Sequence, residues 1–270
     1  MNDSESAKRE RFIREGAGVI GDVGGATVGA AVGTVVAGPI GTVVGAGAGA
    51  AFSLATRRVV DEFIGRKLSD RERARVAGGM YFASRRINAR LEAGEVPRND
   101  GFFDEGQSGR SQAEELFEGA LLKCKNEHEE KKTPYLANIF ANSSFQESID
   151  PNTANFALQK GQELTYQQIC LLALIHRQDE IGADMTEYWR GGWERADSAN
   201  YQTLRLQLYG LGSEGHHFVS YAQGTTSMTK PYLTPVGCQL YDLMGLDEMP
   251  REEIQRVWNS LQEFDPTGFE

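Results

Sequence analysis

Histidines and cysteines are the first residues of this chain to test for chemistry. His216 and His217 are its only adjacent histidines, in a β-like stretch, and neighbouring side chains on a strand face opposite ways, which suits them poorly to binding one metal ion. Cys124, Cys170 and Cys238 are far apart and form no C-x-x-C pair, which indicates buried thiols in a reducing compartment. We therefore expect no metal site.

Two glycine patterns match the dinucleotide fingerprint G-x-G-x-x-G. They are "GAGVIG" at 16–21 and "GLGSEG" at 210–215. Neither follows a convincing strand or lies in a βαβ unit, and chance matches are common in a chain with 31 glycines. The chain also lacks a P-loop, G-x-S-x-G and H-E-x-x-H. We expect no catalytic residues and no cofactor, and an enzyme would need a pocket that these motifs do not reveal.

A register of small residues at every fourth position is the strongest pattern of the sequence. It comprises Gly21, Gly25, Gly29, Gly33, Ala37, Gly41, Gly45 and Gly49. On a helix this spacing forms one smooth stripe that lets two backbones approach closely. Because glycine costs about 1 kcal/mol per helical position relative to alanine, such a helix needs packing partners. The pattern predicts helix packing and self-association.

The segment around this stripe is uncharged from Val23 to Thr56 and is interrupted by Gly38 and Pro39. Proline removes a backbone donor and disfavours helix in the residue before it, so this pair predicts a hinge or a hairpin turn. Each arm of about 16 residues would be about 24 Å long as a helix, against a hydrocarbon core of about 30 Å. Neither arm spans a bilayer comfortably.

This segment resembles the glycine-zipper segments of bacterial membrane-active proteins. The resemblance covers about 35 of the 270 residues and implies helices packed in or on a membrane, in that group often as an oligomer or a pore. Two other interpretations stay open. One is a hairpin buried in a protein core, and the other is a flexible linker, although linkers contain fewer valines.

Basic residues follow the uncharged segment directly. Residues 57–90 carry ten basic and four acidic side chains, whereas 91–270 carry 14 basic and 29 acidic ones. Basic residues beside an apolar segment favour the cytoplasmic side and attract anionic lipid. The expected lipid-headgroup ligands are Arg57, Arg58, Arg66 and Lys67. This places the chain at the inner (cytoplasmic) membrane with its C-terminal domain in the cytoplasm; a solvated helix face or a nucleic-acid contact are the alternatives.

Capping boxes predict where several helices begin. Ser69 with Glu72 predicts a helix over about 70–92, and Ser111 with Glu114 and Thr165 with Gln168 predict two more. The expected fold is mainly α, with a glycine-zipper hairpin and a helical bundle. Its parts are a polar segment at 1–15, the hairpin at 16–56, a basic helical region at 57–92, a linker at 93–110 and a second domain at 111–264.

The C-terminal third changes character. "HHFVSYA" predicts a short β element, and "YLTPVGCQLYDLMG" restarts a helix with Thr234 as its cap and Pro235 at its first position. This order resembles winged-helix modules. The stretch "EKKTPYLANIFANSSFQ" followed by "LTYQQICLLALI" resembles the abortive-infection alpha type of bacterial phage-defence proteins. The acidic charge of 91–270 argues against nucleic-acid binding and favours a protein partner.

Taken together, these features predict a membrane-associated effector without enzymatic activity. It would oligomerise through the glycine stripe and perturb or permeabilise the inner membrane, in the setting of phage defence. The alternative is a soluble winged-helix-like regulator or scaffold that uses the glycine hairpin only for self-association.

Overall fold

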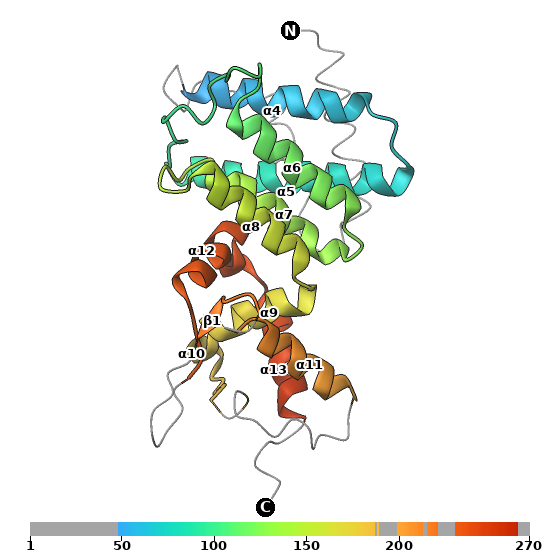
Figure 1. The fold of residues 1–270 in the computed structure, drawn as a ribbon, viewed down its shortest axis with the longest axis vertical. Coiled ribbons are helices and arrows are strands. Elements are labelled where there is room, and N and C mark those ends of the chain that lie inside the picture. The colour runs from blue at the N-terminus through green and yellow to red at the C-terminus, as the bar shows by residue number, and fades with distance from the viewer. Residues whose placement is uncertain (1–47, 187, 189–198, 213–214, 221–229, 264–270) are drawn as a thin grey trace, which may run out of the picture. The chain divides into compact units, whose positions relative to one another are not determined.

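The computed structural model describes residues 48–186, 188, 199–212, 215–220 and 230–263 (Figure 1). This part of the chain is mainly helical, with ten α-helices and one small two-stranded sheet. The fold class expected from the sequence is thus confirmed at this level. The predicted glycine hairpin lies outside the described residues except at its C-terminal end. The described chain forms two compact units, the first ending at Glu163 and the second beginning at Leu164.

The first unit is a helical bundle, and its described elements are α4 (Ala48–Gly65), α5 (Asp70–Glu92), α6 (Gln112–Asn126), the 3-10 turn η2 (Glu130–Lys132), α7 (Thr133–Ser143) and α8 (Pro151–Glu163). Helix α7 is buried along its whole length and packs against α5, α6 and α8. Helices α4 and α5 are joined by a short turn and run in opposite directions (Figure 1).

The predicted capping boxes form as expected. The Ser69 hydroxyl accepts a hydrogen bond from the Glu72 N–H, and the Glu72 side chain accepts one from the Ser69 N–H. The same reciprocal pair forms at Ser111, and again at Thr165 in the second unit. These pairs satisfy N–H groups that a helix N-terminus otherwise leaves unbonded. The helix predicted over about 70–92 is therefore confirmed.

Residues 93–110, expected to be a linker, contain no helix or strand but pack against the first unit. Phe102 and Phe103 are buried and meet edge to face, with ring centroids 5.1 Å apart. Arg98 is only 4% exposed. Its guanidinium donates to the carbonyl oxygens of Ser143 and Ile149 and also pairs with the Asp100 carboxylate. The segment is thus a structured part of the first unit and does not separate two domains.

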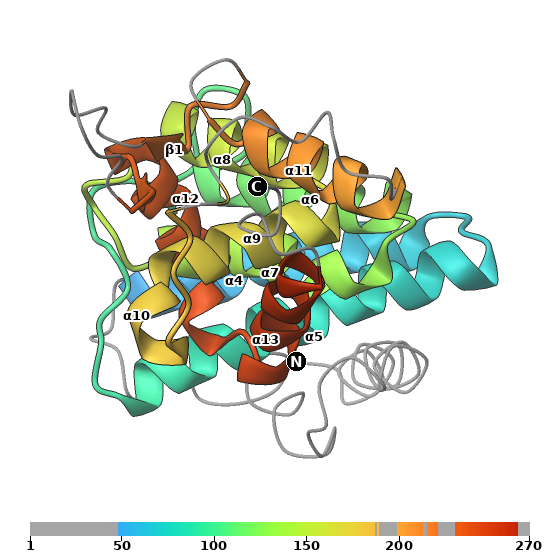
Figure 2. The same cartoon turned by 90° about the horizontal axis from the view of Figure 1, so that it is seen from below.

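The second unit contains α9 (Tyr166–His176), α10 (Gln178–Ile181), α11 (Ala199–Gly210), β1 (Val219–Ser220), β2 (Tyr232–Leu233), α12 (Pro235–Met244), the 3-10 turn η5 (Leu246–Glu248) and α13 (Arg251–Gln262). The apolar helix α9 contacts α11, α12, α13 and β2 (Figure 2). Strands β1 and β2 are antiparallel, with Val219 opposite Leu233. Thr234 caps α12 as predicted, accepting a hydrogen bond from the Gly237 N–H.

Within the described ranges, no helix combines the length and the apolar character needed to cross a membrane. Helix α4 is the one that continues from the uncharged segment, and it carries Arg57, Arg58, Asp61 and Glu62. It also crosses the predicted boundary at residue 56 without a break.

Candidate functional site

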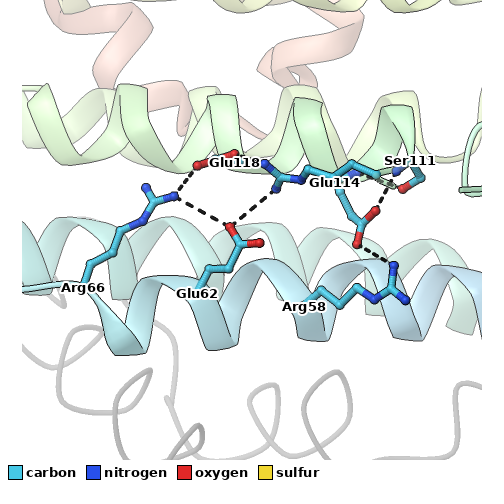
Figure 3. A network of polar contacts seen from close by, with 7 residues as sticks. Arg58, Glu62, Arg66, Ser111, Glu114 and Glu118 are labelled. Carbon is cyan, nitrogen blue, oxygen red and sulfur yellow. Dashed lines mark hydrogen bonds and ion pairs between the residues drawn. The ribbon is translucent and has the colours of Figure 1, made fainter. Parts of the chain in front are cut away.

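Helix α4 packs against the rest of the first unit with an apolar face and a charged face. Its apolar side chains Val59 and Phe63 are fully buried, which fixes the helix against the bundle. Arg58, Glu62 and Arg66 follow each other at four-residue spacing from α4 into the turn beyond it, so they lie on one side and face α6 (Figure 3). This row of alternating charge contains two of the four predicted lipid-headgroup ligands, Arg58 and Arg66.

Glu114 on α6 serves two purposes at once. One of its oxygens accepts a hydrogen bond from the Ser111 N–H at 2.6 Å and completes the capping box. The other lies 3.4 Å from Arg58 Nη1. The Glu114 side chain is only 4% exposed, whereas that of Arg58 is 43% exposed and also reaches Glu105. A buried carboxylate therefore anchors a half-exposed arginine.

Glu118, one turn further along α6, is held between two arginines. One oxygen accepts from Arg66 and the other from Arg110 (Figure 3). Glu62 closes the arrangement from α4, with its carboxylate 3.7 Å from Arg66 Nη2 and 3.6 Å from Arg110 Nη2. Two carboxylates and two guanidiniums thus alternate around one ring. Together with Arg58 and Glu114, they form what we call the α4–α6 ion-pair network.

The ion pairs shift the pKa values of two members of this network, Glu118 and Arg110. Burial raises the pKa of the Glu118 carboxyl, but hydrogen bonds from Arg66 and Arg110 outweigh that effect and bring the pKa below its ordinary value. The hydrogen bond to Glu118 in turn raises the pKa of Arg110. Both groups are therefore charged at neutral pH.

Other arginines of the basic region are also engaged within the first unit. Arg71 and Arg75 on α5 both pair with Glu130, Arg75 at 3.0 Å. Arg86 and Arg90 donate to the same oxygen of Asn142 on α7, at 2.9 and 2.8 Å. The carboxylates of Glu114, Glu118 and Glu130 thus offset part of the excess positive charge of residues 57–90, whereas the neutral Asn142 amide accepts hydrogen bonds without balancing charge.

The structure places the sequence-predicted site residues as follows. Of the glycine stripe, only Gly49 is described, in the first turn of α4; the other stripe residues and the hinge at Gly38 and Pro39 lie outside the described residues. Lys67 is exposed in the turn after α4, and Arg57 is half-buried.

Sequence reasoning identified Arg58 and Arg66 but missed their partners. Glu114 was found only as a capping residue, and nothing in the sequence connects it with a residue 56 positions away. No sequence motif marks Glu118 or Arg110. Each lies four residues from Glu114, a spacing that places side chains on one side of a helix. Charge complementarity between a basic segment and a later acidic one was the signal that could have suggested the pairing.

The other clusters that could do chemistry are occupied by internal contacts. The side chains of Glu127, His128 and Glu129 come close enough to hold a metal ion. Glu127, however, forms a buried ion pair with Lys132 at 2.7 Å, and its other oxygen accepts from the Glu129 N–H. That pair supplies the counter-charge a cation would otherwise provide, so the cluster fits a metal poorly.

The loop that contains "GLGSEG" is folded on itself. The Gly210 carbonyl accepts from the His216 N–H, and the Gly212 carbonyl accepts from both Gly215 and His217. These N–H groups are therefore turned inward and not toward a phosphate. His216 and His217 precede β1, so the expectation that they lie on a strand is wrong; the loop closes first, with His217 at a φ of 60°.

Comparison with known proteins gave no match to a protein-family model, to a characterised protein or to a solved structure. Functional inference for this chain therefore rests on its own residues.

Proposed function

We propose that this protein is a membrane-associated effector whose helical first unit anchors a self-associating glycine-rich segment. The observation that carries the proposal is the continuity of α4. This helix starts at Ala48, within the uncharged segment, and is held in the first unit by the ion-pair network with α6 and by the burial of Val59 and Phe63. Self-association of the glycine-rich segment would therefore act directly on the first unit through this helix.

The burial of α4 limits how much chain a membrane could take up. Ala55 and Thr56 are 4% and 3% exposed. The second arm of a hairpin would then comprise residues 40–53, about 21 Å as a helix, against a hydrocarbon core of about 30 Å. A pair of such short arms favours insertion into one leaflet with packing between copies over two full crossings. In this proposal the small residues at 21–45 form that contact between copies, and disturbance of the bilayer follows from their assembly.

The test is leakage of dye from vesicles of phosphatidylglycerol and phosphatidylcholine, normalised to bound protein. Gly29→Leu places a bulky side chain on the stripe, and Ala31→Leu adds the same side chain nearly opposite it on a helix. We expect Gly29→Leu to abolish leakage and crosslinking between copies while binding persists, and Ala31→Leu to retain all three. Equal leakage from both variants would remove the stripe from the mechanism. A deletion control should remove residues 16–47 and spare α4.

The second unit supports a different candidate role, as a winged-helix-like module for a protein partner. The order of α11, β1, β2 and α12 and the Thr234 cap favour it. Residues 164–270 carry seven basic and 15 acidic side chains, and this acidic balance makes a basic protein surface the expected partner. Salt-dependent binding of the chain to DNA, with no vesicle binding, would instead favour the soluble regulator.

A further inference from the structure

We infer that Glu118 on α6 and Glu62 on α4 compete with anionic lipid for Arg66 and Arg110: these carboxylates occupy the two arginines, and lipid phosphate must displace them to bind. This inference rests on the proposed membrane association and describes how the folded protein would regulate it. Its basis is the geometry of the ion-pair network, in which Arg66, predicted from the sequence to bind lipid, and Arg110, found only in the structure, already have acidic partners in the folded protein (Figure 3).

The exchange is sterically possible without unfolding. The side chains of Arg66 and Arg110 are 34% and 32% exposed, so solvent reaches part of each, and the buried Nη2 atom of Arg110 becomes accessible only when that side chain moves. The apolar side of α4, with Val59 and Phe63 fully buried, can stay in place while an arginine side chain changes partner. Arg66 follows the end of α4, and Arg110 precedes α6. Neither arginine lies inside a helix, so its side chain can change partner while both helices stay in place.

The carboxylates and lipid phosphate compete for the arginines through the same kind of interaction. A carboxylate and a lipid phosphate both accept charge-assisted hydrogen bonds from a guanidinium, so one arginine cannot serve both fully. Glu118 holds its arginines with two direct hydrogen bonds, whereas Glu62 lies 3.6–3.7 Å from them and is 45% exposed. Glu118 is therefore the stronger competitor and Glu62 the weaker one.

Glu115 offers a control on the same helix. It is exposed, forms no ion pair among the described residues, and carries the same charge as Glu118. Glu115→Gln and Glu118→Gln change the net charge of the protein equally. A difference between them in lipid binding therefore reports the release of Arg66 and Arg110 and not the net charge.

The experiment measures partition of the full chain onto vesicles of equal parts phosphatidylglycerol and phosphatidylcholine, and onto phosphatidylcholine alone. A freed arginine near an anionic surface strengthens binding about fivefold. We expect Glu118→Gln to bind anionic vesicles about fivefold or more tightly than Glu115→Gln, with no difference on phosphatidylcholine. Glu62→Gln, at a more exposed position, should show a smaller increase and guards against misfolding of the first variant. The double variant Arg66→Gln/Glu118→Gln should lose the part of the gain that Arg66 contributes and keep the part that comes from Arg110.

The outcomes separate the inference from the function on which it rests. If the wild-type chain binds anionic vesicles and Glu118→Gln and Glu62→Gln bind no tighter than Glu115→Gln, the competitor is excluded and membrane association stands. If the wild-type chain does not bind but Glu118→Gln does, the competitor is supported in its strongest form. If no variant binds, both are overturned.

Discussion

Gly237 at the start of α12 approaches the main chain of Phe218 so closely that a Cβ atom on Gly237 would stand 2.1 Å from the Phe218 carbonyl oxygen. The same carbonyl accepts a hydrogen bond from the Thr234 N–H, and the Thr234 hydroxyl donates to the His217 carbonyl. The chain before β1 and the cap of α12 are thus joined by main-chain contacts. The glycine of "LTPVG" is required for close approach and not for backbone flexibility.

Gly237→Ala should therefore destabilise the second unit. The clash is with backbone, so no side-chain rotation relieves it, and we expect a loss of about 3 kcal/mol. All three tryptophans of the chain lie after residue 164, so tryptophan fluorescence during urea unfolding reports on this unit. Gly65→Ala is the control, because a Cβ there meets nothing within 4 Å. An unchanged urea midpoint for Gly237→Ala would contradict the assigned contact.

Local chemistry accounts for what the sequence predicted well. The starts of α5, α6, α9 and α12 were each given by a hydroxyl residue and its capping partner or by Thr-Pro, and all four are confirmed. Such signals act over three or four residues, so one sequence suffices to find them. The same pattern at Asp150 starts α8, where its carboxylate accepts from the N–H groups of Asn152 and Thr153.

Long-range pairing accounts for what the sequence could not predict. The segment 93–110 is rich in glycine and polar residues, and composition alone indicates a linker. Its attachment depends on Arg98, whose acceptors lie 45 and 51 residues further on. The contacts of Arg66 with Glu118 are equally remote, 52 residues apart. Neither of these long-range contacts produces a periodic pattern in the sequence.

Arg98→Ala should release this segment from the first unit. The substitution removes the Arg98 donor from the carbonyl oxygens of Ser143 and Ile149, of which that of Ser143 keeps the Gln146 N–H, and it exposes Phe102, over which the guanidinium lies at 4.5 Å. We expect a cost of about 3 kcal/mol and faster hydrogen exchange across 98–106 and at the end of α7. Lys67→Ala, at an exposed position, should alter neither. Exchange that speeds up equally everywhere would mean global unfolding and not local release.

The three cysteines should react in a defined order with iodoacetamide at pH 8. Burial raises the pKa of the Cys124 thiol to about 12, and it also raises that of Cys238, which is only partly buried. Since the thiolate is the reactive form, we expect Cys238 to be modified first and Cys124 to stay protected in the folded protein. Peptide mass spectrometry measures each site, and denaturation in guanidinium should make all three reactive. Early modification of Cys124 would contradict its burial.

Glu118 should make the first unit sensitive to acid. Its pKa is lower in the folded protein than the ordinary value of 4.5, so its ion pairs stabilise the fold above that pH and are lost as the pH falls through the folded pKa. Replacement by glutamine removes this contribution, about 1 kcal/mol for a partly exposed network. In urea unfolding followed by far-UV circular dichroism, we expect Glu118→Gln to be less stable than Glu115→Gln at pH 7, and this difference to shrink as the pH falls below 4.5. A difference that is absent at pH 7 would show that the ion pairs contribute nothing to stability.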